Sequence, residues 1–189
     1  MSKKYLRAGL GVCLIAAAIF ATLGEGESSG SGDSGDKAEE SAAPASSQAS
    51  PIPLGTDVEV AADWNLKVNS AELDANATMA AANQFNTPEE GKQYVLVNVS
   101  ITNNSDQPAA PLTNVTLSLL PPSGIAADPS FVAGLSGAID IMAQMQPGAT
   151  ATGVVPFEVP AAEAAASVLL GQSTFTLDEA KDQKFFAIQ

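Results

Sequence analysis

The stretch YVLVNVSIT at residues 94–102 decides the fold class of this chain. Branched apolar residues occupy every second position along it, namely Val95, Val97, Val99 and Ile101. Successive side chains of a β-strand point to opposite faces, so this alternation predicts a strand with one face in an apolar core. The intervening positions include an asparagine, a serine and a threonine, which suit a face toward water.

Shorter stretches with the same alternation predict further strands on both sides of this one. They lie at residues 57–62, 64–69, 115–120, 154–159 and 185–188, with a weaker candidate at 139–145. Clusters of proline, glycine, asparagine and aspartate separate them, and Gln146-Pro147-Gly148-Ala149 is the clearest turn. The sequence therefore predicts an all-β fold, an immunoglobulin-like antiparallel β-sandwich of about seven to nine strands.

Two local features refine this expectation. Trp64, the only tryptophan, lies on a predicted strand and is expected to fill the core. Residues 160–164 begin with a proline followed by alanines and a glutamate, which suits a single helical turn. No long amphipathic pattern predicts a helix.

The N-terminal residues 1–24 have the pattern of a signal peptide, with a retained N-terminal anchor as the alternative. Lys3, Lys4 and Arg7 precede an apolar run at residues 8–23, which is short of the roughly 20 apolar residues of a comfortable transmembrane helix. Cys13, the only cysteine, lies in the middle of the run after a valine, so we expect it to be removed with the signal. The chain is accordingly expected to be exported, and to act outside the cell or at its surface.

Residues 25–53 are assigned to a disordered acidic tether, and residues 54–189 to the sandwich. Serine, glycine, alanine and acidic residues dominate the tether, and residues 25–50 contain no aromatic residue, valine, isoleucine or leucine. Such a composition buries too little apolar surface to offset the entropy of ordering.

The charge of the chain bears on its partners. Its formal net charge is −13 at pH 7, which opposes binding to the phosphates of nucleic acids. It equally opposes docking on anionic lipid, so contact with a membrane is expected only through the N-terminal segment, if that segment is retained. With nucleic acid and anionic lipid disfavoured, the expected partner is an unknown protein or an envelope ligand.

The sequence offers few groups for catalysis. It contains no histidine, the usual acid or base near neutral pH, and no cysteine beyond the signal. The carboxylate pairs at Glu72/Asp74, Glu89/Glu90 and Asp178/Glu179/Asp182 are expected in solvated turns. We therefore expect no enzyme, no catalytic residues and no cofactor.

A calcium site is only weakly indicated. Asp74, Asn76 and Thr78 alternate as ligands do in a calcium loop. However, Met79 replaces the glycine that an EF-hand loop needs, and Phe85 replaces its closing glutamate. No metal ligands are therefore assigned.

The long connection between residues 75 and 91 holds the one interaction loop that the sequence suggests. Its candidate residues are Asn83, Gln84, Phe85 and Asn86. A loop of this length is often functional, although it also suits an ordered cover over one end of the sandwich.

Three parts of the chain resemble a known family. They are Trp64 with Val68, the run from Asn83 to Asn86 followed by GKQYVLVNV at 91–99, and GVVPFEVP at 153–160 with FFAIQ at 185–189. They resemble a family of exported bacterial immunoglobulin-like domains of unknown function, similar in fold to a small secreted immunogenic protein of mycobacteria. A telomere-repeat-binding label attached to some members implies DNA binding, which the acidity of this chain opposes.

Three functions remain open at this point. The first is an exported immunoglobulin-like module that binds a partner or ligand at the cell envelope or outside the cell. The second is a structural envelope protein without a small-molecule ligand. The third is a hydrolase that uses paired carboxylates, which two facing carboxylates in a cleft would support.

Overall fold

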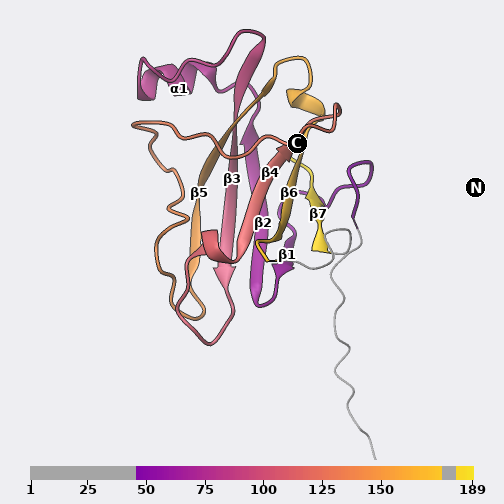
Figure 1. The fold of residues 1–189 in the computed structure, drawn as a ribbon, viewed down its shortest axis with the longest axis vertical. Coiled ribbons are helices and arrows are strands. Elements are labelled where there is room, and N and C mark those ends of the chain that lie inside the picture. Colours follow the sequence, from indigo (N-terminus) through magenta and orange to yellow (C-terminus); the bar gives the residue numbers. More distant parts are fainter. Residues whose placement is uncertain (1–45, 176–181) are drawn as a thin grey trace, which may run out of the picture. The chain divides into compact units, whose positions relative to one another are not determined.

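The computed structural model describes residues 46–175 and 182–189. In this part the chain forms seven strands, one α-helix and two short 3₁₀ helices (Figure 1). In chain order they are β1 (Asp57–Ala61), β2 (Trp64–Glu72), α1 (Asn76–Ala82), β3 (Lys92–Asn103), η1 (Pro111–Thr113), β4 (Val115–Leu120), β5 (Thr150–Pro160), η2 (Ala164–Ala166), β6 (Val168–Ser173) and β7 (Lys184–Phe186).

The strands form two sheets in which every pair of neighbours is antiparallel. One sheet has four strands in the order β1-β2-β3-β5, and the other has three in the order β4-β6-β7. The predicted all-β, immunoglobulin-like antiparallel sandwich is confirmed. The predicted strand at residues 94–102 lies within β3, the longest strand, which pairs with β2 on one side and β5 on the other.

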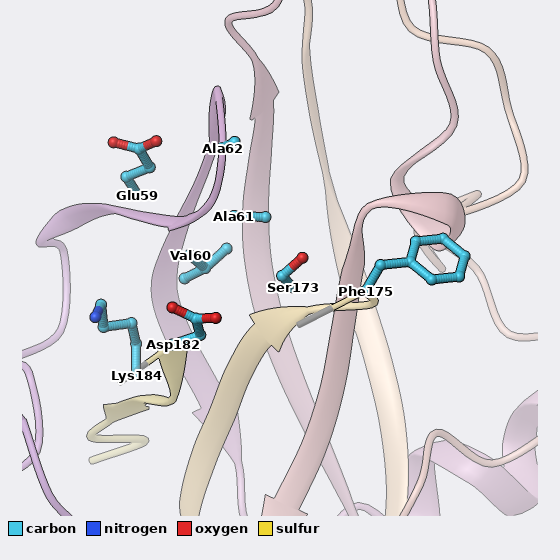
Figure 2. A pocket seen from close by; sticks show the side chains of 8 residues that line it. All are labelled: Glu59, Val60, Ala61, Ala62, Ser173, Phe175, Asp182 and Lys184. Atoms are coloured by element: carbon cyan, nitrogen blue, oxygen red, sulfur yellow. The ribbon is translucent and has the colours of Figure 1, made fainter. Parts of the chain in front are cut away.

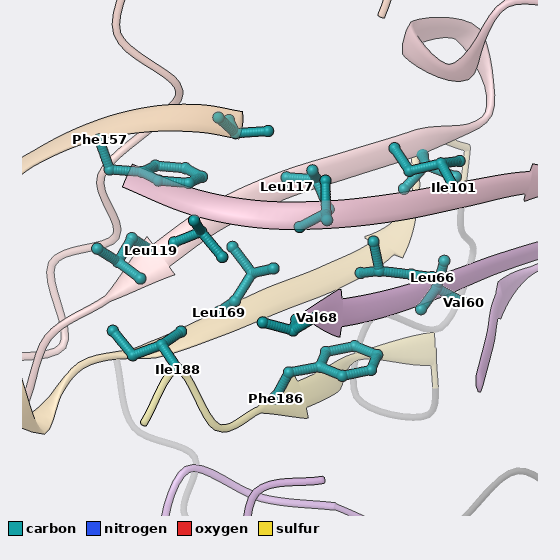
Figure 3. Packing of buried hydrophobic residues seen from close by; sticks show 14 of the residues in the cluster. Val60, Leu66, Val68, Ile101, Leu117, Leu119, Phe157, Leu169, Phe186 and Ile188 are labelled. Carbon is teal, nitrogen blue, oxygen red and sulfur yellow. The ribbon is translucent and has the colours of Figure 1, made fainter. Parts of the chain in front are cut away.

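The core lies between the two sheets. Figure 3 shows apolar side chains of the four-stranded sheet meeting those of the three-stranded sheet. Leu66, Val68, Ile101 and Phe157 come from the first sheet, and Leu117, Leu119, Leu169 and Phe186 come from the second. Trp64 also belongs to this core, with 2% of its surface exposed, as its place on a strand predicted.

The outer face of β3 is partly covered, which its alternating sequence does not reveal. Tyr94 and Leu96 are buried there beneath Met79 of α1 and the segment 132–135. Gly134 allows the close approach, because a Cβ at this position would lie 2.7 Å from the carbonyl oxygen of Ala82. The sequence did not predict α1, which is seven residues long and has no side-chain N-cap.

The packed part of the chain begins before residue 54. Ile52 is buried in the core, although it lies in the range assigned to the tether. Its N–H donates to the carbonyl of Phe185 (2.7 Å), and its carbonyl accepts from the N–H of Ala187 (2.8 Å). Residues 1–45, with the rest of the tether and the proposed signal, lie outside the described residues.

The connection between β4 and β5, residues 121–149, runs along the side of the sandwich where both strands are edges (Figure 1). It pairs with β4 at Leu119↔Ala127, and with β5 at Pro129↔Phe157 and Ala138↔Val154. The weaker candidate strand at 139–145 is not formed, since single bridges hold this stretch. The predicted turn at 146–149 is present, with Gly148 at φ +78°.

No helix in the described ranges combines the length and the apolar character needed to cross a membrane.

Candidate functional site

The suggested interaction loop follows directly after α1, and its four residues have different surroundings. Asn86 is buried, and its side chain donates to the carbonyl oxygens of Met79 (3.2 Å) and Ala133 (2.9 Å). Asn83 accepts a hydrogen bond from the backbone N–H of Phe85. Gln84 and Phe85 are exposed, so they are the members of this loop that a partner can reach. The loop as an interaction site stays a prediction.

Two acidic side chains of the predicted carboxylate pairs, Glu72 and Glu89, engage local partners. Glu89 forms an ion pair of 2.6 Å with Lys92, and Glu72 accepts from the hydroxyl of Thr78 (2.7 Å). The hydrogen bond and the charge of Lys92 lower the pKa of Glu89, and the hydrogen bond that Lys92 donates to Glu89 raises the pKa of Lys92. Both groups are exposed, so their pairing contributes little to stability.

Two of the three residues of the weak calcium pattern, Asn76 and Thr78, have hydrogen-bond partners within the chain. Asn76 accepts from the backbone N–H of Tyr94 (2.9 Å), while Thr78 donates to Glu72. In the part of the chain that the structure describes, no three acidic or cysteine side chains are grouped as metal ligands would be. Asp178 and Glu179 of the third carboxylate cluster lie outside that part.

A hollow of about 400 Å³ lies beside β1 and the ends of β6 and β7 (Figure 2). Its lining includes Glu59, Ser173, Asp182 and Lys184, and Figure 2 shows the Phe175 ring pointing away from the rest. Residues 176–181 connect two of its lining residues and lie outside the described part of the chain.

The candidate site is an apolar groove on the other side of the sandwich, which we call the edge groove. It consists of two adjoining hollows of about 280 and 210 Å³ that share Pro129, Phe131, Ile141 and Val155. The larger hollow is completed by Pro111 and Leu112 of η1, by Val115, Thr116 and Leu117 of β4, and by Ile101 and Asp128.

The edge groove reaches the core of the domain. Ile101, Leu117 and Val155 line it and also belong to the buried core cluster; Figure 3 shows the first two inside the core. Phe131, which lines both hollows, is fully exposed, and Leu112 of the larger hollow is half-exposed. Exposed apolar side chains around a hollow are typical of a binding site.

The path of the 121–149 connection creates the groove. Ala127 pairs with Leu119 of β4, but Pro129, two residues later, pairs with Phe157 of β5. Proline has no N–H and therefore cannot extend the pairing with β4. The chain thus crosses from β4 to β5 after Ala127. It leaves the space between the two strands unfilled beside Leu117 and Val115 of β4.

Two polar side chains lie on the wall of the larger hollow. Asp128 accepts a hydrogen bond from the hydroxyl of Ser118 (3.3 Å), and the hydroxyl of Thr116 lies 3.1 Å from that of Thr174. A carboxylate beside an apolar hollow favours a ligand with an apolar part and a cationic or hydrogen-bond-donating part. The arrangement shows no paired reactive groups.

The sequence did not indicate this site. Phe131 lies outside every predicted strand, and Ile139 and Ile141 lie on the weaker candidate strand that does not form, so their common position depends on the path of the backbone. The only sequence features that point to a site here are the length of the connection and its apolar residues among prolines and glycines.

A comparison with family models assigns the domain to a family. A model for a domain of unknown function, DUF4352, matches residues 54–181, and the chain belongs to this family. The predicted resemblance to a family of immunoglobulin-like domains of unknown function is thereby confirmed. No curated protein matches the chain.

Several solved structures have a similar fold. The yjhA protein from Bacillus subtilis is 14% identical with a TM-score of 0.49, and the match covers 73% of this chain and 99% of that chain. An uncharacterized β-sandwich protein from Clostridium difficile is 12% identical with a TM-score of 0.46, covering 74% and 95%. The secreted protein MPT63 from Mycobacterium tuberculosis is 14% identical with a TM-score of 0.46, covering 72% and 95%.

Proposed function

We propose that the chain is an exported immunoglobulin-like binding module, and that it holds an apolar group of its partner in the edge groove. The observation that carries this proposal is the continuity between the groove and the core. Ile101, Leu117 and Val155 line the hollow and belong to the buried core, while Phe131 of the same lining is fully exposed. Apolar surface thus continues from solvent to the core, as at a site that binds an apolar group.

Export is supported by the cationic and apolar pattern of residues 1–24, which lie outside the described part of the chain. Measurement of the intact mass of the protein from its native host tests this part. Removal of residues 1–24 is the expected result, and an intact N-terminus would favour the retained anchor instead.

A binding role agrees better with the chemistry of the site than hydrolysis does. Glycoside hydrolysis by carboxylates needs two of them on opposite sides of the substrate. The edge groove holds one, Asp128, whose partner in the structure is a serine hydroxyl. We therefore propose no reaction at this site.

A series of alkyltrimethylammonium ions from butyl to decyl tests the groove directly. Each methylene that enters an apolar site adds about 0.8 kcal/mol, so affinity should rise about fourfold per methylene until the hollow is filled. Backbone amide signals in NMR spectra should shift at Leu117, Phe131 and Ile141. Alkyl sulfates of the same lengths should bind more weakly, because the chain is acidic.

Two matched variants separate the edge groove from the loop after α1. Phe131→Ala and Phe85→Ala both remove an exposed phenyl ring, but only Phe131 lines the groove. We expect Phe131→Ala to weaken binding of the longer ions at least threefold, and Phe85→Ala to leave it unchanged. The reverse pattern would move the site to the loop, and scattered shifts without dependence on chain length would rule out the groove.

A further inference from the structure

We propose that the occupant of the edge groove is an extended, cationic segment of a partner polypeptide, which adds a strand to the free edge of β4. The inference rests on the proposed function and specifies the chemistry of its ligand. It begins with the hydrogen bonds of β4, whose inner edge pairs with β6 along its whole length.

Leu119 shows which residues of β4 direct their backbone away from β6. Its N–H donates to the carbonyl of Ala127, and its carbonyl accepts from the N–H of Ala127, both at 2.8 Å. Backbone groups of a strand alternate between its two edges, so residues two and four positions earlier face the same way. Leu117 and Val115 therefore direct their N–H and C=O groups toward the edge groove.

These backbone groups lie in an apolar environment. Leu117 and Val115 are only 6% and 5% exposed, and both line the larger hollow. Among the described residues, no backbone group continues the pairing of Leu119 with Ala127 to Leu117 or Val115. Buried N–H and C=O groups are strongly driven to find hydrogen-bond partners.

An added strand supplies partners at the right spacing. Continued from Ala127, an antiparallel strand would pair one residue with Leu117 and the second residue after it with Val115. Directly opposite residues of an antiparallel pair project their side chains from the same face. Because Leu117 and Val115 point into the core, the two partner side chains would enter the apolar groove. An alkyl chain alone would fill the hollow but leave the backbone groups unpaired.

The intervening residue of the added strand would lie on the opposite face, next to Thr116 and Ser118. Asp128 lies on that face, since its carboxylate accepts from the hydroxyl of Ser118. A lysine or arginine at the intervening position would thus come near this carboxylate. The net charge of −13 favours such a cationic partner and disfavours pairing with a second copy of the chain.

The probe for this proposal is the peptide acetyl-Thr-Val-Lys-Leu-Thr-amide, titrated into the full chain and followed by NMR. Three altered peptides accompany it: one N-methylated at Val and Leu, one N-methylated at Lys, and one with Glu in place of Lys. N-methylation removes a backbone donor and blocks pairing on that edge without removing the side chain. It therefore tests the backbone contacts by themselves.

The strand model gives a pattern that alternates along the peptide. Methylation at Val and Leu should weaken binding at least tenfold, because these amides face β4. Methylation at Lys should change it by less than about twofold, because that amide faces away. The amide protons of Leu117 and Val115 should exchange more slowly in the complex, whereas that of Thr116, which already pairs with β6, should be unaffected.

The charge contact has its own test. The peptide with Glu should bind several-fold more weakly than the peptide with Lys. Asp128→Asn should reduce this difference, since it removes the charge but keeps an oxygen acceptor for Ser118.

Failure of the inference is distinguishable from failure of the proposed function. Suppose that the alkyl ions bind, but that N-methylation at Val and Leu of the peptide changes its affinity no more than N-methylation at Lys does. The groove then binds apolar groups, and the strand model is overturned. If neither alkyl ions nor peptides bind, both proposals fail. If Leu117 becomes protected merely as the protein concentration rises, the occupant is a second copy, which also overturns the proposal.

Discussion

Asn86 and Ala133 are joined by a reciprocal pair of hydrogen bonds. The Asn86 amide nitrogen donates to the Ala133 carbonyl at 2.9 Å, and the Ala133 N–H donates to the Asn86 amide oxygen at 3.2 Å. The same nitrogen also donates to the carbonyl of Met79. One buried side chain thus connects the end of α1 to the connection that forms the edge groove.

Replacement of Asn86 by alanine should therefore destabilise the domain. It leaves the N–H and the carbonyl of Ala133 without their partner, whereas the carbonyl of Met79 keeps the N–H of Asn83. A buried unsatisfied group of this kind costs about 1–3 kcal/mol. Urea unfolding of the variant and of the parent chain measures the difference. Gln84→Ala, two residues away and exposed, is the control and should change the free energy of unfolding by less than about 0.5 kcal/mol. Equal stabilities of the two variants would contradict the assigned role of Asn86.

A second prediction concerns Trp64 and Phe131, two large aromatic residues in opposite environments. Trp64→Ala should cost about 3–5 kcal/mol, because the side chain is almost completely buried in the core. Phe131→Ala should cost less than about 0.5 kcal/mol, because the ring is fully exposed. Thermal and urea unfolding check both values. A large loss of stability in Phe131→Ala would show that the ring supports the fold, and would weaken its use as a probe of binding.

The third prediction concerns the ion pair of Glu89 and Lys92. The ordinary pKa of a glutamate is 4.5, and Lys92 lowers it in the folded chain. A carboxylate with a lowered pKa stabilises the fold above pH 4.5, and this contribution is lost as the pH falls through the lowered value. Lys92→Met should raise the pKa of Glu89, as measured by a carbon-13 NMR titration of its carboxyl group. An unchanged pKa in the variant would show that the ion pair is not formed in solution.

Much of the sandwich follows from local sequence. The alternation in residues 94–102 places Val97, Val99 and Ile101 in the core, as the structure confirms. The same alternation does not reveal that Tyr94 and Leu96 on the opposite face are buried as well. That burial depends on residues 132–135, which lie far away in the sequence and cover this face only after folding.

Helix α1 and the edge groove could not be predicted from local sequence, for a similar reason. Helix α1 has the sequence NATMAAA, which is too short to be stable alone and depends on the packing of Met79 against β3. The groove depends on where the 121–149 connection crosses from β4 to β5. Pro129 marks that crossing, but its sequence alone does not tell which strand it leaves and which it joins.

The last prediction tests how tightly this connection is held on β5. Gly153 has no side chain where the connection passes, and a Cβ there would lie 2.7 Å from both the carbonyl oxygen of Gly137 and the backbone nitrogen of Ile139. Gly171 is the matched control, since its Cβ would also meet an atom at 2.7 Å, but this atom is the terminal methyl Cδ2 of Leu66. A backbone segment moves less easily than the end of a flexible side chain.

Gly153→Ala should therefore destabilise the domain by about 1–3 kcal/mol, and Gly171→Ala by less. In the Gly153 variant the amides of Val154 and Ile139 should exchange faster with solvent, because their hydrogen bonds join the connection to β5 at 2.8 and 3.1 Å. Hydrogen exchange followed by NMR measures this directly. The same variant should bind the alkyl ions differently from the parent chain, since Ile139 and Val154 line the smaller hollow. Unchanged exchange at both amides would mean that the connection is held at other points, and that Gly153 is not what allows it to lie on β5.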